Sequence, residues 1–237
     1  MIDGPWHICV LVPARNEEKL LSRCLQSIRR ARARVSLPMT TDIVVIDDGS
    51  TDSTFSIAKK SLAGSGVVLR TNAGIVGAVR RAGAAIALSR YSGPSHRCWL
   101  ANTDADCIVP ATWLIDQLRL ASEGVEAIAG TVSVDSFAEH DGTVEGRFRL
   151  SYTIHEDGSH PHVHGANLGV RADAYLRAGE WNALETAEDH DLWGRLRNMS
   201  AARLSTAGIE VITSGRRQGR APSGFAGALA AHNQTAA

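Results

Sequence analysis

The sequence predicts an α/β fold in which a mostly parallel central sheet is flanked by helices. Three observations predict it. Short β-branched runs alternate with helical patterns through the first half of the 237 residues, which is typical of parallel strands joined by helices. Residues 8–12 and 43–46 are apolar without interruption, as expected for buried strands. Acidic segments follow three of the strands, at the edge where such sheets bind ligands.

The expected elements of the first half follow this alternation in order. The strands are residues 7–12, 42–47, 67–69, 98–102 and 127–134, and the helices are residues 17–34, 51–63, 74–90 and 110–122. The first helix has one apolar stripe at helical spacing, formed by Leu20, Leu21, Cys24, Leu25 and Ile28. Pro110 suits the first turn of the last helix, because an N–H is not needed there.

The second half is less regular. Residues 136–159 are polar, contain several glycines and match no element. We expect residues 164–171 to be short and partly extended, residues 187–199 to form a helix, and residues 211–213 to form a last strand.

Composition excludes several classes of function. Lys and Arg number 25 and Asp and Glu also number 25, so the formal net charge is zero, whereas a nucleic-acid-binding protein needs a basic excess. No apolar run approaches the roughly 18 residues of a membrane-spanning helix. The N-terminus lacks the features of a secretion signal, and the four cysteines form no C-x-x-C pair. We therefore expect a cytoplasmic protein with reduced thiols and no membrane span.

Acidic clusters follow the first, second and fourth expected strands, at residues 13–18, 47–52 and 104–106. Each cluster alone has an ordinary explanation as a turn or a helix cap. Because the carboxyl ends of parallel strands meet at one edge of the sheet, we expect the three clusters to lie together. Crowded carboxylates repel one another, so this edge needs a cation or hydrogen-bond donors.

Asp104 and Asp106 form the sharpest of these clusters. Their two-residue spacing at a strand end can point both carboxylates to the same side. Hard oxygen ligands suit Mg²⁺ or Mn²⁺, which bridge to phosphate oxygens. A divalent ion held there would neutralise charge on a departing diphosphate.

Five short segments together match one known family, and they span most of the chain. They are residues 12–18, residues 43–52, Asn72 with Gly77, residues 103–106 and residues 188–192. In order and spacing they resemble the family 2 glycosyltransferases, which are inverting enzymes with the GT-A fold. The resemblance implies a UDP- or GDP-linked sugar as donor, an unidentified hydroxyl acceptor, and Mg²⁺ or Mn²⁺. It also implies one compact domain with a nucleotide-sugar-binding half at residues 1–135 and a half for the acceptor and the catalytic base at residues 136–237.

The resemblance also implies roles for individual residues of the first half. Asp47 would hydrogen-bond the base, Asp104 would hold the ribose or the metal, and Asp106 would ligate the metal directly. Arg80 or Arg81 would contact the diphosphate, but helical geometry lets only one of them face the site easily. The full set expected to bind the nucleotide sugar is Pro13, Ala14, Arg15, Glu17, Asp47, Asp48, Asn72, Gly77, Arg80, Arg81, Asp104 and Ala105.

Asp189 would be the catalytic base of such an enzyme. A helix cap at Thr186 explains one acid at the start of this helix, but it does not explain Glu188, Asp189 and Asp191 together. Inversion needs an in-line displacement, in which a carboxylate takes the proton of the acceptor hydroxyl while the nucleotide leaves from the opposite face.

Four further residues would contact the acceptor or the transferred sugar. They are Gly165, Asn167, Trp181 and Glu188, and for Trp181 a buried core position is an equal alternative.

Two groups of residues keep open interpretations. His160, His162 and His164 alternate along one stretch, which fits a polar loop or a zinc site. His164 is in addition a candidate metal ligand and a candidate member of the acceptor loop. The second group is Arg216, Arg217 and Arg220, which form either a basic tail or a flap that closes on the diphosphate.

Two other functions compete with this interpretation. A metal-dependent nucleotidyltransferase also uses an acidic pair, but it usually has a glycine-rich loop after the first strand, where this chain has residues 13–18 without glycine. A catalytically inactive protein that binds nucleotide sugars is the other alternative, and the presence of both Asp106 and Asp189 argues against it. A signalling receiver domain is a weaker alternative, because such a domain is about half this length and needs a lysine late in the sheet, whereas no lysine follows Lys60.

Overall fold

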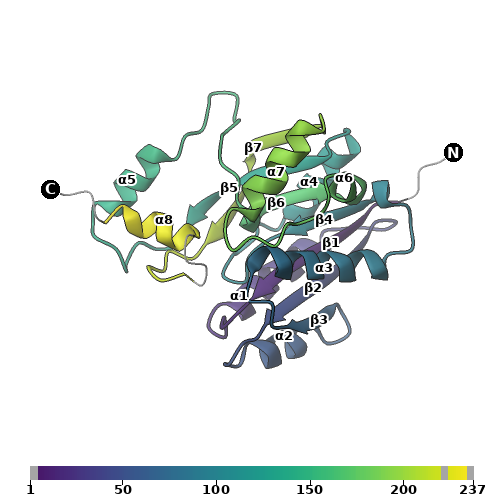
Figure 1. The fold of residues 1–237 in the computed structure, drawn as a ribbon, viewed down its shortest axis with the longest axis horizontal. Helices are drawn as coiled ribbons and strands as arrows, with labels where there is room; N and C mark the ends of the chain where they lie inside the picture. The colour runs from purple at the N-terminus through teal and green to yellow at the C-terminus, as the bar shows by residue number, and fades with distance from the viewer. Residues whose placement is uncertain (1–4, 220–223, 234–237) are drawn as a thin grey trace.

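A seven-stranded sheet forms the centre of the molecule, with strand order β3-β2-β1-β4-β6-β5-β7 (Figure 1). The computed structural model describes residues 5–219 and 224–233. The strands are β1 (His7–Ala14), β2 (Thr40–Asp48), β3 (Val67–Thr71), β4 (Cys98–Asn102), β5 (Ala127–Val134), β6 (Leu168–Arg171) and β7 (Arg203–Thr213). The predicted α/β fold with a mostly parallel sheet is confirmed.

The strand β6 is antiparallel to the other strands of the sheet, and this brings its amino end to the edge where the other strands end. β6 pairs antiparallel with both β4 and β5, whereas the remaining pairs of neighbours are parallel. The carboxyl ends of the six parallel strands therefore lie on one edge of the sheet. The amino end of β6, with the 3-10 turn η2 (Gly165–Asn167) before it, lies on that same edge.

Helices cover both faces of the sheet (Figure 1). On one face α1 (Leu21–Arg32), α2 (Thr54–Leu62) and α4 (Trp113–Ser122) contribute to one hydrophobic cluster. On the other face α3 (Val76–Arg90), α6 (Ala172–Arg177) and α7 (Glu188–Asn198) contribute to a second cluster. A further short turn, η1 (Ser95–Arg97), precedes β4.

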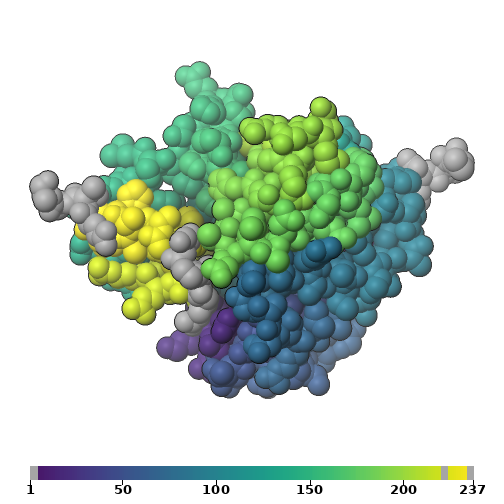
Figure 2. All heavy atoms as spheres, viewed as in Figure 1, coloured from purple at the N-terminus to yellow at the C-terminus, as the bar shows by residue number. Residues whose placement is uncertain are grey.

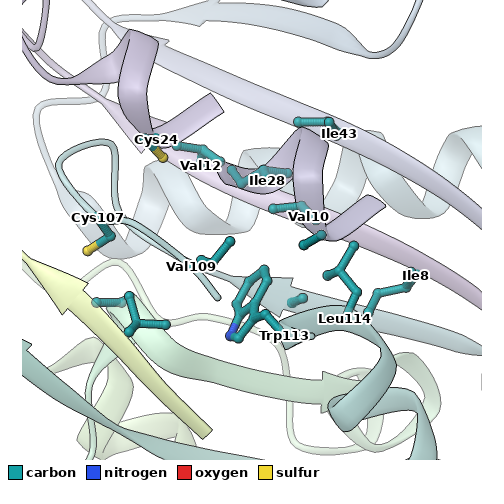
Figure 3. Packing of buried hydrophobic residues seen from close by; sticks show 14 of the residues in the cluster. Ile8, Val10, Val12, Cys24, Ile28, Ile43, Cys107, Val109, Trp113 and Leu114 are labelled. Carbon is teal, nitrogen blue, oxygen red and sulfur yellow. The ribbon is translucent and has the colours of Figure 1, made fainter. Parts of the chain in front are cut away.

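β1 shows why the central strands are continuously apolar. Ile8, Val10 and Val12 point into the cluster beneath α1 and α4 (Figure 3), and the intervening Cys9 and Leu11 point into the opposite cluster. Because side chains alternate between the faces of a strand, a strand with helices on both sides needs apolar residues at every position.

Two helices lie beyond the end of the sheet and pack on each other. Figure 1 shows α5 (Val144–Ser151) and α8 (Phe225–Ala231) side by side, away from the helices that cover the sheet. The ring centroids of Phe148 and Phe225 are 5.8 Å apart, and Arg147 Nη1 donates to the carbonyl of His232 at 2.7 Å. In the space-filling view the yellow α8 region abuts the teal region that contains α5 (Figure 2).

The expected elements of the first half are present, with ends that differ by four residues at most. The second half differs more. β7 starts at Arg203 rather than at residue 211, because residues 205–208 (Ser-Thr-Ala-Gly) form neither an apolar run nor an alternating pattern that would predict a strand. α5 lies inside the unassigned residues 136–159, and α6 and α8 were not expected. These helices have six to eight residues, too short for a clear periodic stripe.

Among the residues that the structure describes, no helix combines the length and the apolar character needed to cross a membrane.

Asn167 ties three elements together in the core. Its side-chain amide donates to the carbonyl oxygens of Thr131 at 2.8 Å and Ile209 at 2.9 Å. Its Oδ1 accepts the indole N–H of Trp113 at 2.9 Å. These bonds lie beside the register shift between β5 and β7 at residues 130 and 131, so Asn167 fills the irregular part of this strand pair.

Asn167→Ala is expected to lower the free energy of unfolding by about 3 kcal/mol, because it leaves three buried polar groups without their partner. Equilibrium unfolding in urea measures the change. Asn182→Ala is the matched control, because Asn182 bonds Asp191 at an exposed position. An unchanged unfolding midpoint for Asn167→Ala would contradict this role.

Candidate active site

A cavity of about 720 Å³ opens at the edge of the sheet where the parallel strands end. Its walls come from the segments after β1, β2, β4 and β7, from the first turns of α3 and α7, and from the segment before β6. Both halves of the chain contribute, because the reversed direction of β6 brings His164 and Gly165 to the same edge as the acidic clusters.

Asp104 and Asp106 follow β4 at the floor of this cavity, and each carboxylate is paired with one arginine. Asp104 Oδ1 accepts from Arg80 Nη2 at 2.7 Å, and Asp106 Oδ2 lies 2.9 Å from Arg216 Nη2. Burial raises the pKa of Asp106, and the charge of Arg216 opposes that rise. The two arginines thus supply the positive charge that the crowded carboxylates need.

The same acids could hold a divalent metal ion. Among the described residues, ligand atoms of Asp104, Asp106 and Cys107 lie within 4.8 Å of one another. Two carboxylates fit Mg²⁺ or Mn²⁺, which prefer oxygen ligands. The Cys107 thiol donates to Asp106 Oδ1 at 3.6 Å, and burial raises the pKa of this thiol. This hydrogen bond from Cys107 therefore helps to orient the Asp106 carboxylate.

Arg216 reaches into the cavity from the segment after β7. Its Nη1 donates to both oxygens of Glu17, at 2.7 and 2.9 Å, so one guanidinium joins Glu17 to Asp106. Arg217 is exposed and does not line the cavity, and its backbone N–H donates to Glu139. Arg220 lies outside the described residues, so the question of a flap built from all three arginines stays open.

Arg80 lies buried between the two halves of the site. Its Nε donates to Glu188 Oε1 at 2.9 Å, while its Nη2 binds Asp104. Its guanidinium lies 5.6 Å from the ring centroid of Trp181, a cation–π distance. A Cβ atom at Gly165 would lie 2.4 Å from Arg80 Nη2, so a larger residue at position 165 would displace the guanidinium from its ion pairs. Within the described residues, the buried Nη1 of Arg80 has no hydrogen-bond partner.

Asp189 is held by two backbone groups at the start of α7. Its Oδ2 accepts the N–H of Gly165 at 2.7 Å, and its Oδ1 accepts the N–H of His190 at 2.8 Å. Ala187, at the N-cap position, has a φ of 57°, which is unfavourable for a residue with a Cβ atom. Strained backbone of this kind is concentrated at functional sites, and here it sets the direction in which the Glu188 and Asp189 side chains leave the helix.

The cavity brings together most of the residues expected from the sequence. Those that line it are Pro13, Ala14, Arg15, Glu17, Asp48, Arg80, Asp104, Ala105, Asp106, His164, Gly165, Glu188 and Asp189. Asp48 accepts the N–H groups of Ala73 and Gly74 and so fixes the segment that leads into α3.

Six expected residues lie outside the cavity lining. Arg81 forms an exposed ion pair with Glu180 at 2.9 Å. Asn167 and Trp181 are core residues, which for Trp181 was the alternative expectation. The remaining three are Asp47, Asn72 and Gly77.

Asp47, Asn72 and Gly77 make contacts with segments other than the cavity lining. The Asp47 carboxylate is fully buried, and Arg70 Nε lies 3.4 Å away; within the described chain neither carboxylate oxygen has a hydrogen-bond partner. Asn72 packs against Gly49. The N–H of Gly77 donates to the carbonyl of Leu184, and a Cβ atom there would lie 2.0 Å from the carbonyl oxygen of Asn182.

The three histidines form a stack of rings. The centroids of His160 and His162 are 5.8 Å apart, and those of His162 and His164 are 6.1 Å apart. Parallel rings at this spacing do not converge on one ion, and none of the three belongs to the cluster of possible metal ligands found among the described residues. The geometry gives no support to zinc, or to His164 as a third metal ligand.

Two aromatic residues of the site were not expected from the sequence. The Tyr152 hydroxyl is hydrogen-bonded to His164 Nε2 at 2.9 Å, and Phe225 lines the cavity. Both come from the irregular second half, and neither belongs to a motif or a periodic pattern. No signal in the sequence could have identified them, because their role depends on α5 and α8 folding over the cavity.

Comparison with solved structures shows which folds this architecture matches. The crystal structure of S. aureus TarS 1-349 has a TM-score of 0.62 at 18% identity, covering 88% of this chain and 60% of that one. The complex of TarS 1-349 with UDP-GlcNAc has a TM-score of 0.63 at 18% identity, and the match covers 92% of this chain and 61% of that one. At such identities the likeness shows the fold, which is the GT-A fold of these glycosyltransferases.

A third structure of this fold is the mannosyltransferase PcManGT from Pyrobaculum calidifontis in complex with GDP-Man and Mn²⁺. Its TM-score is 0.63 at 17% identity, and the match covers 92% of this chain and 61% of that one. This chain thus spans about three fifths of the length of these proteins. A search of curated protein sequences finds no match. Residues 9–177 match the family described as Glycosyl transferase family 2, and the chain belongs to that family.

Proposed function

We propose that this chain transfers a sugar from a nucleoside-diphosphate sugar to an acceptor hydroxyl, with inversion at the anomeric carbon. One observation carries the proposal: a single cavity holds the Asp104/Asp106 pair and the Asp189 carboxylate. Arg80 connects these two groups of acids through its ion pairs with Asp104 and Glu188. Residues 1–135 would hold the donor, and residues 136–237 would hold the acceptor and the base.

The donor half suits a nucleotide sugar. Asp48 lines the cavity and is the acid at the end of β2 that a bound nucleotide would reach, because the Asp47 carboxylate is fully buried outside the lining. Arg80, together with Arg216 from the second half of the chain, pairs with the two acids Asp104 and Asp106. The positive charge of these arginines would attract a bound diphosphate. TarS in complex with UDP-GlcNAc and PcManGT in complex with GDP-Man have the same fold, and we expect UDP or GDP here.

Asp189 is placed to take the proton of the acceptor hydroxyl. Its two backbone hydrogen bonds keep the carboxylate in one orientation, and such positioning accounts for much of what a general base contributes. As the bond to the leaving diphosphate breaks, negative charge develops beside Arg80 and Arg216, which stabilise it. A bound Mg²⁺ or Mn²⁺ at Asp104 and Asp106 would supply additional positive charge at the same position.

The reaction type is tested by incubation with Mn²⁺ and a panel of UDP- and GDP-sugars. We expect release of nucleoside diphosphate, stimulated by an acceptor. Turnover of pyrophosphate would instead indicate a nucleotidyltransferase, and the absence of both nucleotide binding and turnover would overturn the proposal.

Asp189→Asn is expected to lower turnover at least about 100-fold, because it removes the proton acceptor while keeping an oxygen for the N–H of Gly165. Donor affinity, measured by calorimetry, should change little. Asp191→Asn is the matched control, because Asp191 lies on the same helix but pairs with Arg195. Turnover close to wild type in Asp189→Asn would assign the base to another residue.

Arg216→Gln is expected to tighten the binding of Mn²⁺ in the absence of nucleotide by about tenfold, because the ion no longer competes with a guanidinium for Asp106. Titration of Mn²⁺, followed by electron paramagnetic resonance, measures the free ion directly and does not depend on activity. Arg217→Gln is the control. Equal or weaker Mn²⁺ binding in Arg216→Gln would show that the ion binds elsewhere.

A further inference from the structure

The cavity has two chemically different sides. The side formed by Glu17, Asp104, Asp106, Arg80 and Arg216 is dense in charge. Another part of the lining consists of uncharged side chains, namely Val132, Val163, His164, Phe225 and Ala226. We call this second set the aromatic wall. It comes from the ends of β5 and α8 and from the segment before β6.

The aromatic wall adjoins the carboxylate that we propose as the base. Gly165, whose N–H binds Asp189 Oδ2 at 2.7 Å, directly follows His164 in the chain. The ring of His164 meets the ring of Phe225 edge to face, with centroids 5.8 Å apart. A molecule whose hydroxyl reaches Asp189 must therefore lie close to the aromatic wall.

The wall is uncharged because of its hydrogen bonds and its burial. The Tyr152 oxygen accepts the N–H of Val132 at 2.9 Å and is hydrogen-bonded to His164 Nε2 at 2.9 Å. Burial lowers the pKa of His164 to about 3, so the imidazole carries no charge at neutral pH.

The groups around the wall also disfavour an anionic acceptor. The charged groups of the lining around Gly165 and His164 are the acids Glu188 and Asp189 and the cation Arg80, and the exposed His190 also lines the cavity. The Arg80 guanidinium lies against Gly165 but is already paired with Asp104 and Glu188. A phosphate on the acceptor would meet two carboxylates, an arginine whose charge is compensated and a wall without charge, and burying an unpaired charge is costly.

The wall is held rigidly from behind. Tyr152 stacks on His162 with centroids 3.9 Å apart and lies parallel to His164 at 5.9 Å. Phe148 packs against Phe225 from α5. Aromatic faces held in place in this way bind flat apolar groups without first losing much side-chain freedom.

We propose that the acceptor is an uncharged molecule that carries a flat apolar group, such as an aryl ring, next to the hydroxyl that receives the sugar, and that Phe225 and His164 hold this group. The inference rests on the proposed function, because it places an acceptor beside Asp189. Phe225 is here a specificity-determining residue.

The test is the binding of small glycosides to the protein saturated with UDP, or with GDP if that nucleotide binds better, and Mn²⁺. For each of several hexoses, calorimetry compares the methyl glycoside with the 4-nitrophenyl glycoside, and glucose 6-phosphate serves as the anionic probe. We expect the 4-nitrophenyl glycoside of at least one sugar to bind about tenfold more tightly than its methyl partner. Glucose 6-phosphate should bind more weakly than methyl glucoside.

Substitutions at Phe225 test whether the aromatic wall causes the preference for aryl glycosides. Phe225→Ala should reduce the aryl advantage to less than about twofold, while Phe225→Tyr, which keeps the ring, should retain it. Leu150→Ala, at an exposed position of α5, is the control and should behave as wild type. Donor affinity, measured on the same samples, reports whether Phe225→Ala is folded.

The outcomes separate the two proposals. A protein that binds neither UDP nor GDP with Mn²⁺ would count against the proposed function. Binding of nucleotide without any preference for aryl glycosides, an aryl preference that survives in folded Phe225→Ala, or tighter binding of glucose 6-phosphate would each overturn the inference about the acceptor alone.

Discussion

The neutralisation of crowded carboxylates by the buried Arg80 and the partly buried Arg216 is the constraint on which the site depends. Parallel strands deliver their acidic carboxyl ends to one edge, and without counter-charges this edge would be unstable. Arg80 and Arg216 provide the counter-charges from opposite directions, one from α3 and one from the segment after β7. Each joins two acids, so both arginines also determine the distances between the segments that carry those acids.

Arg80 illustrates how a buried charge is accommodated. Two carboxylates satisfy Nε and Nη2, the face of Trp181 covers the guanidinium, and Gly165 leaves the space that it occupies. Trp181 and Gly165 thus affect the cavity by holding the Arg80 guanidinium in position. A charge in such surroundings is stabilised only as long as every partner stays in place, which makes the centre of the cavity rigid.

The antiparallel β6 and the helix pair α5 and α8 explain why the cavity has two different sides. The charged side is built from loops that follow parallel strands, and its chemistry suits a diphosphate. The aromatic side is built from the segment that precedes β6 and from helices that pack on each other beyond the sheet. Loops after parallel strands supply the first side, whereas the second side depends on details of this chain, and we propose that it determines acceptor specificity.

The sequence by itself determined the alternation of strands and helices in the first half, the acidic edge and the family. Those features depend on local patterns, such as the apolar runs of β1 and β2 and the spacing of Asp104 and Asp106, which survive in any context. Only the tertiary structure decided that Arg80 rather than Arg81 enters the cavity, that Asn167 and Trp181 belong to the core, and that Tyr152 and Phe225 line or support the site. These outcomes depend on contacts between segments far apart in the chain, and no local pattern in a single sequence encodes such contacts.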